Sequence, residues 1–179
     1  MNYHIFKEFI SLEDANTLID WINAKQSTNT FSRAGHPGTI RQTTRFSKNV
    51  IYPKVSFTIQ NAVDEKVKSL FNLSKIQRVP GLPHGMYGSY GTVGDSCQIH
   101  KDPRYLMNHI TYHFNIMLNE YEGANLYIEN ELVNLGKLDG VLYPVSEVNH
   151  HTTELIGTNP RIFWCFGYCI PLQNTAFTI

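Results

Sequence analysis

The sequence lacks several features that mark common classes of protein. Charge of one sign is not in excess, because 15 basic and 15 acidic residues cancel, and this balance argues against a dedicated binder of nucleic acid or another polyanion. No apolar run approaches the length of a membrane span. Residues 1–8 have neither the positively charged start nor the apolar core of a signal peptide. These absences predict a cytoplasmic protein.

Cysteine is scarce as well. The chain contains Cys97, Cys165 and Cys169 and no Cys-x-x-Cys pair, so we expect neither a disulfide framework nor a structural zinc site. Cys165 and Cys169 lie in a very apolar segment, where they should pack as small hydrophobic side chains. The length of 179 residues, 42% of them hydrophobic, predicts one domain over 1–179.

Residues 1 to about 75 carry two helical patterns. Ser11 is a suitable N-cap, with Asp14 in the first turn, and apolar residues then recur at helical spacing as far as Ile22. A second amphipathic pattern begins near Pro53 and ends around residues 71–72. The polar stretch between them, residues 25–49, is typical of a loop with short strands.

From about residue 76 to 175 the pattern changes to short apolar runs separated by Pro, Gly and Asn. Such spacing predicts a β-sandwich or barrel, here with the helices packed on one side. Residues 107–118 alternate with a period of two, and the polar members include His109, His113 and Asn115. Their face either lines a cavity or meets solvent. Residues 161–170 alternate too, and Arg161 begins the less bulky face.

The residues with the clearest chemical meaning are His100 and Asp102. At i and i+2 on a strand, both side chains project from one face and can reach one metal ion. A distant second histidine completes the two-histidine, one-carboxylate set that holds non-haem Fe(II) and leaves positions open for a co-substrate and O₂. His150 and His151 both qualify, but they point to opposite faces of a strand, so only one can be the ligand.

Arg161 follows this histidine pair after a Gly157–Pro160 turn. Its guanidinium is suited to hold a carboxylate through two parallel hydrogen bonds. The ordered set of His100, Asp102, one distal histidine and Arg161 therefore predicts an iron oxygenase with a carboxylate-bearing co-substrate.

Several segments resemble the Fe(II)- and 2-oxoglutarate-dependent dioxygenases, and most closely the compact prolyl-hydroxylase-like branch. These segments are MYGSYGTVGD (86–95), FNIMLNE (114–120), EGANLYI (122–128) and DGVLYP (139–144), together with His100, Asp102, His150 and Arg161. The resemblance covers about residues 85 to 170, and Ala124 and Asn125 depart from it.

The resemblance implies a double-stranded β-helix, which is a jelly-roll core, backed here by two helices. It implies that Fe(II) is bound by His100, Asp102 and His150, with His151 as the alternative, and that 2-oxoglutarate is bound by Arg161, Tyr90 and Asn115. The implied reaction consumes O₂ and converts 2-oxoglutarate to succinate and CO₂, with ascorbate as a supporting reductant. Asp102 favours hydroxylation, because halogenating relatives carry a small residue there.

The substrate is less defined. An amino-acid-type small molecule is expected, with a peptide or carrier-bound side chain as the alternative. Candidate contacts are His113 and Tyr127, together with Arg41 and Arg45 from an acid-free segment (33–54) that reads either as a cationic lid or as a solvated loop. The competing classes are a nucleic-acid oxygenase, a non-catalytic jelly-roll module and a cupin-like metal isomerase.

Overall fold

The computed structural model describes residues 3–26, 32–33, 41–44 and 50–175. Its strands are β1 (His4–Phe6), β2 (Ser32–Arg33), β3 (Gln42–Thr43), β4 (Met86–Gly91), β5 (Cys97–His100), β6 (His109–Met117), β7 (Leu126–Ile128), β8 (Glu131–Leu132), β9 (Gly140–Tyr143), β10 (His150–Thr152) and β11 (Arg161–Pro171). They form a seven-stranded sheet in the order β1-β9-β6-β11-β4-β3-β2 and a four-stranded sheet in the order β5-β10-β7-β8. All pairings are antiparallel, as a jelly roll requires.

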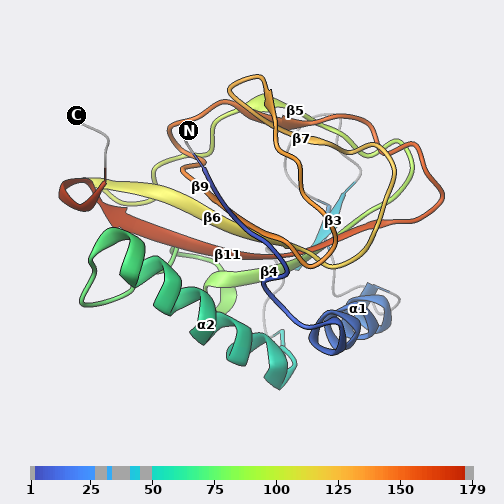
Figure 1. Cartoon of the computed structure of the whole chain (residues 1–179), viewed down its shortest axis with the longest axis horizontal. Helices are drawn as coiled ribbons and strands as arrows, with labels where there is room; N and C mark the ends of the chain where they lie inside the picture. Colours follow the sequence, from blue (N-terminus) through green and yellow to red (C-terminus); the bar gives the residue numbers. More distant parts are fainter. Residues whose placement is uncertain (1–2, 27–31, 34–40, 45–49, 176–179) are drawn as a thin grey trace.

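Two helices, α1 (Leu12–Gln26) and α2 (Lys54–Phe71), lie against the seven-stranded sheet, on the side away from β5 and β7 (Figure 1). The Ser11 hydroxyl caps α1 by accepting a hydrogen bond from the Asp14 backbone N–H at 3.0 Å. Asn72 ends α2 in the left-handed conformation, which Asn tolerates better than most residues. Both predicted helices are therefore confirmed. Within the described residues, neither is long and apolar enough to cross a membrane.

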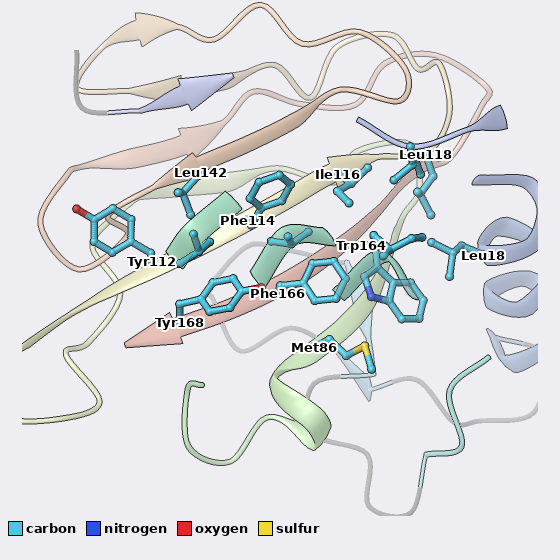
Figure 2. Close-up of a cluster of buried hydrophobic side chains, with 14 of the residues drawn as sticks. Leu18, Met86, Tyr112, Phe114, Ile116, Leu118, Leu142, Trp164, Phe166 and Tyr168 are labelled. Atoms are coloured by element: carbon cyan, nitrogen blue, oxygen red, sulfur yellow. The ribbon is translucent and has the colours of Figure 1, made fainter. Parts of the chain in front are cut away.

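The main hydrophobic core lies between these helices and the central strands β6 and β11 (Figure 2). From β6 it receives Phe114 and its apolar neighbours in the alternation, and from β11 it receives Trp164, Phe166 and Tyr168. The opposite face of β6 is also buried, because His113 and Asn115 are only 3% and 6% exposed. Of the two readings of this polar face, the structure therefore supports the one that turns it inward.

The N-terminal region is not purely helical. β1 pairs with β9 at one edge of the seven-stranded sheet, and β3 and β2 extend the other edge beyond β4. β1 was not expected from the sequence, because three residues are too few to display a period of two. It forms through pairing with a strand more than 130 residues away.

A buried polar cluster fastens α2 to the sheet. Asp64 of α2 accepts hydrogen bonds from both terminal nitrogens of Arg78, at 3.2 and 2.6 Å, and from the hydroxyl of Tyr168 in β11 at 2.9 Å. Charge-assisted bonds of this kind give the helix a fixed position that apolar packing alone would not specify. This cluster lies on the helix-facing side of the sheet, whereas the opposite face carries the polar residues described next.

Candidate active site

Two histidines and one carboxylate meet where β5 and β10 pair. His100 is the last residue of β5 and lies directly opposite His150 of β10. Asp102 follows two residues later, and its backbone N–H donates to Val145 O at 2.8 Å, which fixes the chain beyond the strand. One potential ligand atom from each of the three residues lies within 4.8 Å of the others. This is the distribution of donor atoms that a single metal ion needs.

The backbone orients both imidazoles. His100 Nδ1 lies 2.7 Å from Gln98 O, and His150 Nδ1 lies 3.2 Å from Val148 O. Because a carbonyl oxygen can only accept, Nδ1 carries the proton in each of these hydrogen bonds. Nε2 is then the atom with a lone pair available to a metal, and the backbone contact is the usual support of a metal-binding histidine.

Electrostatics at this cluster favour a cation. Burial lowers the pKa of His100, but hydrogen bonds with Asp102, Cys97 and Gln98 O raise it by more, to about 10. The Asp102 carboxylate, whose Oδ1 lies 3.5 Å from Nε2 of His100, thus stabilises a proton on the imidazole. A divalent metal ion would replace that proton.

His150, and not His151, faces the cluster. His151 borders the cavity, but its ring stacks on Tyr127, with centroids 5.0 Å apart and planes 10° from parallel. The alternation of β10 separates the two residues: His150 is buried, whereas His151 is half-exposed. The arrangement thus brings His100, Asp102 and His150 together and leaves His151 outside the set.

Arg161, the first residue of β11, lies in the same cavity and is 2% exposed. Its guanidinium carbon is 4.7 Å from the ring centre of Phe163 and 5.5 Å from that of Tyr121, and Nη2 is 4.0 Å from the sulfur of Met117. In the described part of the chain, nothing accepts a hydrogen bond from its Nε or Nη1. A buried cation without a counter-ion is costly, so this end of the cavity favours an anion.

Asn115 and Tyr143 lie in the same cavity wall. Asn115 of β6 donates through Nδ2 to the Tyr143 hydroxyl at 3.2 Å, and both residues line the cavity. Burial, followed by the charge of Asp102, raises the pKa of Tyr143, so its hydroxyl stays protonated. Sequence reasoning missed Tyr143 as a site residue. Its place in the DGVLYP segment, one of the segments that carry the resemblance, was the available signal.

Of the other residues predicted for the site, some line the cavity and some do not. Tyr90, which was expected beside the co-substrate, packs instead against the helix-side core, because β4 turns its neighbours Ser89 and Gly91 inward. Tyr127 stacks on His151 and is not among the residues lining the cavity. His113 and Arg41 do line the cavity, and Arg45 lies outside the described residues.

Arg41 is held in the cavity wall by an ion pair. Its Nε donates to the buried carboxylate of Asp95 at 3.0 Å, and its Nη2 donates to the Thr152 hydroxyl at 3.2 Å. Burial lowers the pKa of Arg41, but the Asp95 charge and other contacts raise it by more, so the guanidinium stays charged. Gly91 makes room for this pair, because a Cβ at that position would collide with the Asp95 carboxylate.

No family model and no curated protein sequence matches the chain, but solved structures do. A Trichoplax adhaerens prolyl hydroxylase in complex with a hypoxia inducible factor peptide is 11% identical over 99% of this chain and 87% of that one, with a TM-score of 0.70. SnoN, a non-haem α-ketoglutarate-dependent epimerase from nogalamycin biosynthesis, is 8% identical over 94% and 78%, with a TM-score of 0.68. HygX of Streptomyces hygroscopicus, crystallised with nickel and 2-oxoglutarate, is 11% identical over 99% and 84%, with a TM-score of 0.67. At these identities the likeness shows a shared fold, and it confirms the expected jelly roll.

Proposed function

We propose that the protein is an Fe(II)- and 2-oxoglutarate-dependent oxygenase. The observation that carries this proposal is the presence in one cavity of the His100–Asp102–His150 cluster and of Arg161, a buried cation that lacks a counter-ion among the described residues. Two imidazoles and one carboxylate are the donor set of non-haem iron. A guanidinium binds a carboxylate in a planar, two-bond geometry. A 2-oxo dicarboxylic acid is the kind of ligand that can satisfy both ends.

Different residues would bind the metal ion and the co-substrate. Nε2 of His100, Nε2 of His150 and a carboxylate oxygen of Asp102 would hold Fe(II), while Arg161 would hold the distal carboxylate of 2-oxoglutarate. When bound, iron and 2-oxoglutarate together turn O₂ into an oxidant as 2-oxoglutarate becomes succinate and CO₂. HygX supports the assignment, because that neighbour was crystallised with nickel and 2-oxoglutarate.

The Asn115–Tyr143 pair completes the co-substrate half of the cavity. Because Asn115 donates to the Tyr143 oxygen, the O–H of Tyr143 points elsewhere and can donate a hydrogen bond to a ligand oxygen. The surrounding side chains exclude solvent from this half, which strengthens each of these hydrogen bonds.

For the reaction, we propose hydroxylation of an unactivated C–H bond in a small, amino-acid-type substrate. The remaining cavity wall supports a polar substrate, since it includes Arg41, Thr43, Ser89 and Thr152. Two neighbours define the alternatives: the Trichoplax enzyme is in complex with a peptide, and SnoN is an epimerase. The shared fold thus occurs in proteins that carry out different reactions.

The test needs no knowledge of the substrate. Under argon, Fe(II) and then 2-oxoglutarate are added to metal-free protein, and the weak visible charge-transfer band of the chelate is recorded. We expect a band only with both additions, its loss in His100→Ala, and its retention in the matched control His151→Ala. Iron binding without a band would refute the 2-oxoglutarate assignment and favour a cupin-like metal enzyme. Absence of iron binding would favour a non-catalytic module.

A further inference from the structure

The inward face of β6 carries three buried polar side chains, Thr111, His113 and Asn115. A polar group buried in the middle of a sheet is costly unless it has a partner. Thr111 donates to Pro103 O at 3.0 Å, in the loop that follows β5 and contains Asp102, and Asn115 donates to Tyr143. Two of the three therefore contact the surroundings of the candidate active site. His113 lies between them on the same face, so its contacts show what it could do there.

His113 and His100 approach different oxygens of the Asp102 carboxylate. Nδ1 of His113 lies 3.7 Å from Oδ2, whereas Nε2 of His100 lies 3.5 Å from Oδ1. The two oxygens of one carboxylate are thus directed to two different histidines. The three-residue cluster contains His100 and not His113, so Oδ1 is the oxygen next to a candidate ligand and Oδ2 is the oxygen next to His113.

His113 is also fixed in place. It is 3% exposed, it lies in the central strand opposite Tyr143 of β9 and Gly167 of β11, and its ring meets Tyr87 edge to face, with centroids 6.2 Å apart. A buried side chain on a strand that is paired along both edges cannot turn toward a substrate without displacing its neighbours. This rigidity suits a support better than a recognition contact.

We propose that His113 is a positioning residue that holds Oδ2 of Asp102 away from the metal, so that Asp102 binds it through Oδ1 alone. A carboxylate can bind a metal through one or both oxygens, and an N–H facing one of them restricts the ligand to the other. Single-oxygen binding leaves one more coordination position for exogenous ligands, as the open face of this site requires. This role rests on the proposed function, and it replaces the expectation that His113 contacts substrate.

The experiment is a metal titration with Co(II) under argon, read by its visible d–d spectrum, which reports coordination number. His113→Phe keeps a planar aromatic ring, slightly larger than imidazole, and removes the N–H. His113→Asn places an amide nitrogen near the position of Nδ1, whereas His113→Gln places it near the position of Nε2. His109→Phe is the matched control, since His109 lies on the same strand and bonds to Met107 O at 2.8 Å, away from Asp102.

We expect His113→Phe to weaken Co(II) binding by about 10–100-fold and to change the d–d spectrum toward higher coordination. His113→Asn should recover a large part of both properties, His113→Gln less, and His109→Phe should match the wild type. Thermal unfolding of each metal-free variant identifies any that fails to fold. If His113→Phe is unfolded, the comparison of His113→Asn with His113→Gln tests the positioning role.

Wild-type affinity and spectrum in His113→Phe would overturn the positioning role alone. So would equal behaviour of the Asn and Gln variants. If the wild-type protein itself binds neither Co(II) nor Fe(II), the metal site fails, and the proposed function and this inference fall together. The experiment also distinguishes a purely structural role of His113, because loss of such a role would lower thermal stability without changing the Co(II) spectrum.

Discussion

Replacing Arg161 with Met should make the metal-free protein more stable and abolish its response to 2-oxoglutarate. Arg161 is buried, and within the described residues its Nε and Nη1 have no acceptor. Its surroundings, Phe163, Tyr121 and Met117, suit an apolar side chain of similar length. The charge is therefore expected to lower the free energy of unfolding of the empty protein, and a bound anion would offset this loss.

The size of the effect follows from opposing contributions. Replacing a buried ion pair with well-packed apolar residues is often neutral or stabilises a protein by about 1–4 kcal/mol, and we apply this range to Arg161. Against this, the contacts of the guanidinium with two aromatic rings contribute about 0.5–2 kcal/mol that Met loses. The expected net gain is about 1–2 kcal/mol, or roughly 2–8 °C in Tm for a chain of this length. In the wild type, 2-oxoglutarate at a hundred times its Kd should add about 2.7 kcal/mol.

The assay is urea unfolding of the metal-free proteins, followed by thermal unfolding under argon with Fe(II), with and without 2-oxoglutarate. Arg104→Met is the control, because Arg104 pairs at the surface with Glu147 at 2.6 Å. A surface pair of this kind is worth at most about 1 kcal/mol, and its loss should leave the ligand response intact. The reasoning fails if Arg161→Met lowers the stability of the metal-free protein and 2-oxoglutarate still stabilises the variant.

Two further outcomes follow from other contacts. Tyr143→Phe removes the hydroxyl that accepts from Asn115; it should weaken 2-oxoglutarate binding by about tenfold without changing Fe(II) affinity, as measured by titrating the charge-transfer band. For Asp139, burial raises the pKa, but hydrogen bonds from Lys7 and from the Gly136 and Glu8 backbone lower it by more. Its contribution to stability is therefore complete above the unfolded-state pKa of about 3.9 and is lost as pH falls through the lower folded-state value. Urea midpoints measured from neutral pH down to about pH 3 should fall less steeply in Asp139→Asn than in the wild type, and parallel curves would contradict this assignment.

Features governed by local geometry could be predicted from the sequence. The period of two in residues 107–118 correctly separated the apolar face from the polar one, because successive side chains of a strand must point to opposite faces. Ser11 and Pro53 marked the starts of both helices for equally local reasons. The proximity of His100 and Asp102 needed only their separation of two residues at a strand end.

Features governed by pairing between distant strands could not. Tyr90 was expected in the cavity, but the register that places Tyr90 opposite Ile162 on β11 turns it toward the helices. The choice between His150 and His151 depends on a similar register, since His150 is the residue paired with His100. One residue of slip in either pairing would exchange the inward and outward sets.

The site lies between the two sheets, and this has a consequence for how it is held together. His100 and His150 come from the four-stranded sheet, whereas His113, Asn115 and Arg161 come from the seven-stranded one. A metal ion with a bound dicarboxylate would therefore add a connection between the two sheets, beside existing contacts such as the hydrogen bond from Arg41 to Thr152 of β10. Because such a ligand binds the folded arrangement alone, its binding free energy adds directly to the stability of the sandwich. On the proposed function, the buried charges that we expect to destabilise the empty protein would be the groups through which its ligands connect the two sheets.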